Sequence, residues 1–203
     1  MNKIAVIGGT GMTGQCVVDY AVKKGLKVRL MYRNISTVPE AFKTKQEIEL
    51  VEGDATKLDN VKNLLNDVDG VCVILGTRNN LEPTTEMSTG TQNVVEAMKT
   101  LNLKKFSVIM SSFLFWEESK VPKQFEHINN EHKKMLEITK HSGLDFVAIL
   151  PPHISDEPYT EVEITENKSP GRIVPKVNLA KFIVDSLDQP ERYGKVWGIA
   201  KTA

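Results

Sequence analysis

The chain has 203 residues, and its 26 Lys and Arg residues balance its 26 Asp and Glu residues, so the formal net charge is zero. The balanced charge argues against a nucleic-acid or membrane-surface partner, and no apolar run reaches the roughly 18 residues of a membrane span. Two cysteines, Cys16 and Cys72, exclude a disulfide framework. We expect one α/β domain over residues 1–203, in a monomeric, cytoplasmic protein whose early first strand leaves no signal peptide.

Strand and helix patterns alternate along the chain, as in a parallel sheet with crossover helices. Strands are predicted at 3–7, 27–32, 48–52, 70–75, 105–110, 145–150, 161–166, 172–174 and 195–200, and helices at 12–24, 58–66, 85–101 and 126–141. A last helix is predicted from an N-cap at Asn178 to Leu187. His127 and His132 do not share one helix face, so no metal site is expected. The pattern indicates a single-domain, doubly wound parallel sheet (Rossmann-like), with helices on both faces and ligands at the carboxyl ends of the strands.

A glycine-rich turn follows the first predicted strand. Gly9, Gly11 and Gly14 fit the spacing GxGxxG, while Gly8, Gly11 and Gly14 fit GxxGxxG, so two registers are open. Glycine permits a sharp turn and a close approach of the backbone to a pyrophosphate, which the N-terminus of the next helix also favours. The turn predicts a dinucleotide-binding βα unit, with an ordinary tight turn as the alternative.

Arg33 follows the second predicted strand, where folds that prefer NAD usually carry Asp or Glu. A carboxylate there accepts the ribose 2′-OH, whereas a guanidinium offers several donors to a 2′-phosphate. We therefore expect NADPH as the cofactor, with Ser36 adding a hydroxyl; a plain surface arginine is the alternative. After the third strand, Asp54 can accept from the adenine amino group, cap the next helix, or do both.

The fourth and fifth strand ends supply residues for the reacting half of the crevice. Gly76 permits close approach to the nicotinamide ribose, and Arg78 can contact the pyrophosphate or an anionic substrate. The Ser111 hydroxyl can donate to a substrate carbonyl or orient the carboxamide. Phe113 and Trp116 can form the floor of a pocket for a flat, conjugated ligand, with packing of the loop onto the core as the alternative.

The sixth strand ends at Pro151 and Pro152, a rigid turn that directs His153 into the same crevice as acid, base or donor. The Tyr-x-x-x-Lys pattern of tyrosine-dependent dehydrogenases occurs only from Tyr20 to Lys24, on the first helix and far from the reacting end. Alcohol oxidation and sugar epimerisation need a strong proton-transfer group. What remains is hydride transfer to an acceptor that needs little acid help.

These motifs together resemble the family of NADPH-dependent flavin reductases, also called biliverdin-IXβ reductases, an atypical branch of the short-chain dehydrogenases. The resemblance extends nearly end to end and is densest at 75–79 with 83–85, at 111–116 and at 150–154. The family implies a broad, shallow site for planar conjugated acceptors. Hydride would pass to a free flavin (FMN, FAD or riboflavin) or to a bilin of the biliverdin-IXβ type.

The resemblance also implies roles for individual residues of this sequence. Cofactor-binding positions are Gly8, Thr10, Gly11, Met12 and Thr13 at the pyrophosphate, Arg33 and Ser36 at the 2′-phosphate, Asp54 and Ala55 at the adenine, Leu75, Gly76, Thr77, Arg78 and Met87 along the middle, and His132, Pro152, His153 and Ile154 near the nicotinamide. The catalytic positions are Ser111 and His153, and the substrate-binding positions are Ser111, Phe113, Trp116 and Arg172.

Two positions depart from the family. Thr37 replaces a second arginine at the 2′-phosphate, and Gln124 replaces a basic residue beside the substrate pocket, where Lys123 can compensate and Arg172 is kept. The primary hypothesis is an NADPH-dependent reductase of free flavins, with bilin reduction as a second activity. The alternative is a non-catalytic redox sensor that binds NADP(H), and a sugar-nucleotide epimerase ranks lower.

Overall fold

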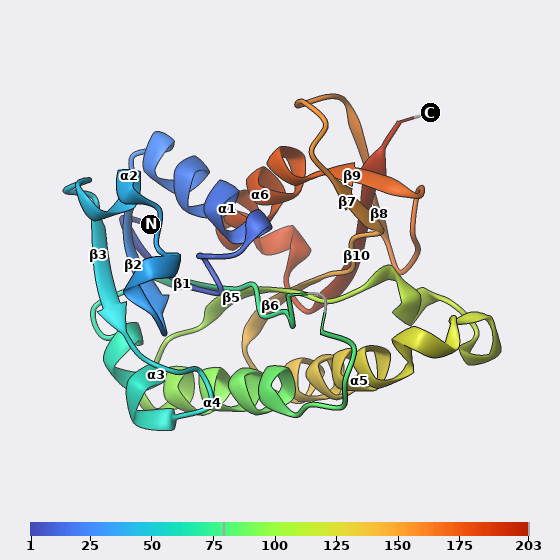
Figure 1. The fold of residues 1–203 in the computed structure, drawn as a ribbon, viewed down its shortest axis with the longest axis horizontal. Coiled ribbons are helices and arrows are strands. Elements are labelled where there is room, and N and C mark those ends of the chain that lie inside the picture. The colour runs from blue at the N-terminus through green and yellow to red at the C-terminus, as the bar shows by residue number, and fades with distance from the viewer. Residues whose placement is uncertain (79, 203) are drawn as a thin grey trace.

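The computed structural model describes residues 1–78 and 80–202. Within this part, one sheet of eight strands runs through the centre, and helices cover both of its faces (Figure 1). The strands in spatial order are β3 (Ile48–Glu52), β2 (Lys27–Tyr32), β1 (Lys3–Ile7), β4 (Gly70–Val73), β5 (Lys105–Ile109), β6 (Asp145–Ile149), β10 (Lys195–Lys201) and β8 (Val162–Glu166). The predicted fold class is confirmed.

The first seven strands of this order pair in parallel, and β8 pairs antiparallel to β10 at the edge. The central strands are apolar on both faces because helices cover both, as expected for a parallel sheet. In β1, Ile4, Ala5 and Val6 have no exposed surface. Their register places Val6 opposite Leu30 of β2 on one side and Cys72 of β4 on the other.

Two helical layers enclose the sheet. The helices α1 (Met12–Lys23) and α6 (Lys176–Asp185) lie together on one face, and α3 (Leu58–Leu65), α4 (Glu86–Thr100) and α5 (Glu126–Lys140) lie on the other (Figure 1). A separate apolar core fills each interface. The short α2 (Glu40–Lys43) lies between β2 and β3 in the chain. This arrangement collects the loops after β1 to β6 at one edge of the sheet.

The pair Tyr20 and Lys24 has a structural role. The Tyr20 hydroxyl lies 3.1 Å from both carboxylate oxygens of Asp185, and Lys24 Nζ lies 2.6 Å from Asp185 Oδ1. Lys181 of α6 contacts the same carboxylate and the Tyr20 hydroxyl. The cluster ties α1 to α6 and engages both side chains of the Tyr-x-x-x-Lys spacing in that contact.

The prediction that Asn178 caps a helix is wrong. The helix α6 begins at Lys176, with Pro175 as its N-cap, so Asn178 lies inside the first turn. Its side chain instead accepts from Thr160 N at 3.2 Å and donates to Thr160 O at 2.7 Å. The amide group is used by the preceding loop, and the rigid φ of proline starts the helix in its place.

Both cysteines are packing residues. Cys72 in β4 is fully buried, and burial raises the pKa of its thiol to about 12 despite a hydrogen bond from Ser107. Cys16 in α1 is half-buried, and burial raises its pKa although Lys176 acts in the opposite direction. Because the thiolate is the reactive form, neither side chain is activated.

Candidate active site

The glycine turn after β1 is closed by contacts that leave no room for side chains at Gly8 and Gly14. Gly8 has φ +82°, and a Cβ atom there would lie 2.0 Å from Ile74 O. A Cβ atom at Gly14 would lie 2.2 Å from Gly8 O, which also accepts from Gly11 N at 3.1 Å. A Cβ atom at Gly9 would lie 2.3 Å from Leu30 Cδ1, so this position is closely packed as well. Both glycine spacings, GxGxxG and GxxGxxG, therefore fit the turn.

The N-terminus of α1 is prepared for an anion. Its N-cap is Gly11, which supplies no side-chain hydrogen bond, and its first turn holds no acidic residue. A Cβ atom at Gly11 would meet only Gly8 O, at 3.4 Å, so the space beyond the turn is open. The exposed N–H groups and the helix dipole both favour a phosphate there. These residues fit the pyrophosphate of a dinucleotide.

Arg78 reaches across this turn from the loop after β4. Its Nη2 donates to Thr10 Oγ1 at 3.1 Å. Its φ of +52° lies in the left-handed region, which costs a non-glycine residue about 1 kcal/mol or more and recurs at functional sites. Thr10 and Arg78, predicted separately, are thus brought together, while Thr77 beside them is half-buried and Thr13 is buried. Asn79, the next position of the resemblance, lies outside the described residues.

Ala55, expected at the adenine, and Leu75, expected along the middle of the cofactor, both pack against Gly90 of α4. A Cβ atom at Gly90 would lie 2.8 Å from Leu75 Cδ1 and 3.2 Å from Ala55 Cβ, so a larger residue would displace both. Asp54 Oδ1 accepts from Thr56 N and Thr56 Oγ1, each at 2.9 Å. The N-cap of α3 is Lys57, so Asp54 shapes the turn before the helix rather than capping it.

The ribose end is arranged by Arg33, Ser36 and their partners. Arg33 Nη1 lies 3.2 Å from Glu86 Oε2 at the start of α4. Ser36 N and Oγ both donate to Asn34 Oδ1, at 2.9 and 2.8 Å. Met87, next to Glu86, is 2 % exposed and belongs to the core beneath this end.

An aromatic cluster follows β5. Phe113 lies on the short 3₁₀ turn Ser112–Phe115, and its ring centroid is 5.0 Å from that of Trp116 and 5.2 Å from that of Phe125. Ser111 Oγ accepts from Phe113 N at 3.2 Å, which leaves its O–H free to donate elsewhere. Trp116 is 49 % exposed, so one face of the cluster is open to a ligand.

The loop after β6 brings His153 to Arg172. The strand β7 (His153–Ser155) pairs in parallel with β9 (Ile173–Pro175), and His153 N donates to Arg172 O at 3.2 Å. The strand β7 was not predicted, whereas its equally short partner β9 was expected at 172–174. The His153 side chain is exposed, Pro152 and Ile154 are half-buried, and no hydrogen bond joins His153 to Ser111 in the described part. Their predicted catalytic roles stay predictions.

Three buried polar atoms of α5 have no hydrogen-bond partner among the described residues: Asn129 Oδ1, His132 Nδ1 and Thr139 Oγ1. His132 and Asn129 are 9 % and 4 % exposed and lie one turn apart. Burial lowers the pKa of His132 to about 4, although the neighbouring Glu131 acts to raise it, so the imidazole is neutral near pH 7. A buried polar atom without a hydrogen bond costs about 1–3 kcal/mol, which a polar ligand group could relieve.

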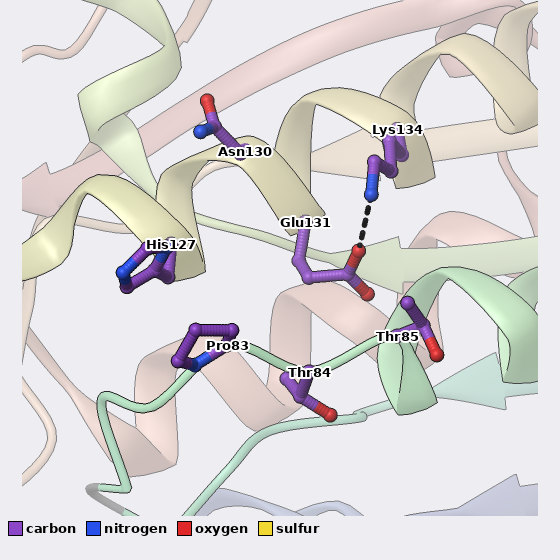
Figure 2. Close-up of a pocket in the computed structure, with 7 residues that line it drawn as sticks. All are labelled: Pro83, Thr84, Thr85, His127, Asn130, Glu131 and Lys134. Carbon is purple, nitrogen blue, oxygen red and sulfur yellow. Dashed lines mark hydrogen bonds and ion pairs between the residues drawn. The ribbon is translucent and has the colours of Figure 1, made fainter.

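A pocket of about 410 Å³ lies between the loop before α4 and the side of α5 (Figure 2). It is lined by Pro83, Thr84, Thr85, His127, Asn130, Glu131 and Lys134, which include none of the predicted site residues. Figure 2 shows Glu131 pointing from α5 toward the start of α4. There it accepts from Ser88 N at 3.0 Å and Ser88 Oγ at 3.1 Å. Its carboxylate links α5 to α4, and its negative charge interacts favourably with the positive N-terminal end of the α4 dipole.

Sequence reasoning missed four residues of this region: Glu86, Gly90, Phe125 and Asn129. A glycine inside a helix was an available signal for Gly90, because it often marks a close approach. The other three depend on contacts between distant segments, which no local pattern contains. In residues 1–78 and 80–202, no group of His, Cys, Asp and Glu side chains could hold a metal ion, and no helix is long and apolar enough to cross a membrane.

Comparison with known proteins supports a nicotinamide dinucleotide as the ligand of this crevice. A family described as NAD(P)H-binding matches residues 8–190, which confirms the predicted class of cofactor. An uncharacterized chloroplastic protein of Arabidopsis thaliana is 29% identical over 121 residues, covering 56% of this chain and 42% of that protein. The chain therefore spans less than half the length of this relative.

Solved structures share the fold at low sequence identity. A putative NAD-dependent epimerase/dehydratase from Bacillus halodurans superposes with a TM-score of 0.85 at 18% identity, covering 100% of this chain and 95% of that one. A short-chain dehydrogenase/reductase from Veillonella parvula in complex with NADP gives 0.78 at 13%, with coverage of 100% and 95%. An oxidoreductase from Lactococcus lactis gives 0.82 at 19%, with coverage of 98% and 91%. These similarities establish the Rossmann-like fold.

Proposed function

We propose that this chain, which belongs to the NAD(P)H-binding family, is an NADPH-dependent reductase of planar conjugated acceptors, with free flavins first and bilins of the biliverdin-IXβ type second. The cofactor would supply a hydride, and a proton from solvent would complete the reduction. The residues of this chain would hold the dinucleotide at the glycine turn and keep the acceptor plane against its reactive end, with water excluded.

The observation that carries the proposal is the exposed aromatic surface on the loop after β5. Trp116 is 49 % exposed and is one of the exposed large hydrophobic side chains of the described residues, with Met12, Ile35, Leu81 and Tyr159. Each of these side chains lies on a segment that follows a strand of the fold. An exposed aromatic face favours a ligand with a flat conjugated face. Trp116, backed by Phe113 and Phe125, is the best placed to contact such a face.

The sparse acid–base equipment agrees with this chemistry. The helix α5 contains no tyrosine, and the buried His132 is neutral near pH 7. Reduction of a flavin needs no strong acid, because the hydride acceptor is itself electron-poor and the proton can come from water. We assign Ser111 as a donor to the acceptor and His153 as a proton relay, with Arg172 beside it for an anionic group.

The reductase assay tests this directly. The loss of near-ultraviolet absorbance of NADPH should depend on added FMN, and a bilin in place of FMN ranks the two acceptor classes. His153→Ala should change the turnover number more than the dissociation constant for NADPH. An unchanged turnover number would remove His153 from the mechanism. NADPH binding without turnover of any flavin or bilin would instead support the non-catalytic sensor.

The preference for NADPH has its own test at Arg33. Arg33→Ala should weaken NADPH binding by about 1–3 kcal/mol, because a charge-assisted hydrogen bond to the phosphate is lost. Binding of NADH, which lacks that phosphate, should change little. Equal weakening toward both would show that Arg33 does not read the 2′-phosphate. We further propose a cytoplasmic monomer with no nucleic-acid or membrane partner, although the Arabidopsis relative is chloroplastic by name.

A further inference from the structure

Arg33, the residue assigned to the 2′-phosphate, is held by a carboxylate. Its Nη1 lies 3.2 Å from Oε2 of Glu86, and the two side chains are 60 % and 63 % exposed. Arg33 follows β2, whereas Glu86 is the first residue of α4, so the pair joins two segments that are 53 residues apart in the chain. The contact therefore spans the crevice mouth at the ribose end.

A second carboxylate lies within the field of Arg33. Burial opposes ionisation of Asp54, but hydrogen bonds from Thr56 and the positive charges of Arg33 and Lys57 lower its pKa overall. Asp54 is thus ionised at neutral pH. The two cations, Arg33 and Lys57, are balanced by Asp54 and Glu86 before any ligand arrives. A 2′-phosphate, which carries about two negative charges, would enter a site without excess positive charge.

The neighbouring hydroxyls add little to a phosphate site in this arrangement. The Ser36 hydroxyl donates to Asn34 Oδ1 at 2.8 Å, and the Thr37 hydroxyl donates to Asn34 O at 2.7 Å. Each proton is already used within the loop after β2. Thr37 also stands where the resembling family has a second arginine, so Arg33 is the residue assigned to carry the phosphate interaction.

We propose that Glu86 determines the cofactor specificity of this chain. Its carboxylate competes with the 2′-phosphate of NADPH for Arg33, and it accepts a hydrogen bond from the ribose 2′-OH of NADH. The chain therefore binds NADH as well as NADPH. Doubly wound folds that prefer NAD place an acidic residue at the end of the second strand for the same hydroxyl. Here the carboxylate comes from α4 and reaches the same edge. The inference rests on the proposed function only in its premise that the crevice binds a nicotinamide dinucleotide.

The test is the pair of dissociation constants for NADPH and NADH, measured by titration calorimetry without any acceptor. Glu86→Gln should tighten NADPH binding roughly twofold to fivefold, the size expected for removal of one exposed, partly screened charge. It should weaken NADH binding roughly twofold to fivefold, because an amide accepts more weakly than a carboxylate. The gain for NADPH should shrink as salt is added, since screening weakens the repulsion that was removed.

Glu82→Gln is the matched control, because it removes the same charge from an exposed position in the preceding loop. The melting temperature of the unliganded protein checks that each variant is folded. The proposal is overturned if Glu86→Gln changes both constants in parallel, or if it behaves as Glu82→Gln does. If the protein failed to reduce flavins, the proposed function would be refuted. The ratio of the NADPH and NADH dissociation constants would still test the role of Glu86, because it is measured without an acceptor.

Discussion

The two ends of the crevice are built in different ways. At the dinucleotide end, the turn is fixed by backbone contacts, with Gly8 and Gly14 so close to neighbouring carbonyl groups that no side chain fits. At the acceptor end, the side chains of Trp116 and His153 are exposed, and His153 is held through the pairing of β7 with β9. One end is therefore part of the packed structure, while the other can change its side chains without unfolding the protein.

This difference separates what the fold determines from what it leaves open. Similar structures bear names as different as a putative epimerase/dehydratase and a short-chain dehydrogenase/reductase, although they share most of their backbone course with this chain. The shared part includes the βα turn that a dinucleotide requires. The acceptor depends on the loops, so function must be argued from Ser111, Trp116 and their neighbours.

The largest effect should come from Gly14→Ala, which would distort the glycine turn at the dinucleotide end. The new Cβ atom would lie 2.2 Å from Gly8 O and 2.6 Å from Gly9 Cα, so the turn must open. We expect a loss of about 1–3 kcal/mol in the free energy of unfolding, the cost of overpacking. NADPH binding should weaken about a hundredfold, because 2.7 kcal/mol of lost contact corresponds to that factor. Thermal unfolding and calorimetric titration measure the two changes.

Gly76→Ala serves as its control, because a Cβ atom there meets no protein atom within 4 Å. It should leave the melting temperature unchanged and weaken NADPH binding only if the cofactor passes over this loop. Normal NADPH affinity in Gly14→Ala would contradict the assignment of the glycine turn to the pyrophosphate.

The same contrast explains how much could be predicted from the sequence. The apolar runs over β1 to β6 and the glycine spacing are local patterns, and the structure has these strands where they were expected to within two residues. The predicted start of α6 was wrong, because asparagine is a common N-cap residue but the Asn178 side chain here bonds to the backbone of Thr160. The partner of Arg33 was missed, because Glu86 meets it only when α4 is packed in place.

A pH-dependent effect on the free energy of unfolding should arise beneath the acceptor end, at His132. Its pKa is lowered from 6.5 to about 4 by burial, so the unfolded chain binds a proton in this range while the folded protein does not. The contribution of the neutral, buried His132 to the free energy of unfolding is fully present above pH 6.5 and is lost as the pH falls toward 4. The loss should total about 3 kcal/mol, at 1.36 kcal/mol for each pKa unit. Denaturant unfolding at a series of pH values measures it.

His132→Leu should flatten this part of the pH profile, because it removes the titrating group while filling the same space. His141→Gln is the matched control, since the His141 side chain is 78% exposed and lies at the end of the same helix. A profile of His132→Leu that runs parallel to that of the unmodified protein would show that other groups cause the acid sensitivity. In that case, pH dependence would not distinguish the acceptor end from the glycine turn, which carries no titratable group.

The smallest effect on stability, and the sharpest on the acceptor, should come from Trp116→Leu. Trp116 is 49 % exposed, so its loss should change the free energy of unfolding by no more than about 0.5 kcal/mol. The KM for FMN should rise roughly threefold to tenfold, because stacking on one aromatic face contributes about 0.5–1.5 kcal/mol. The dissociation constant for NADPH should stay the same, since Trp116 lies at the acceptor end.

The control is Ile35→Ala, at an exposed apolar residue of the ribose end, which should leave the KM for FMN unchanged. If both variants raised that KM equally, the acceptor would not be localised to the aromatic cluster, and the division of the crevice into two ends would fail.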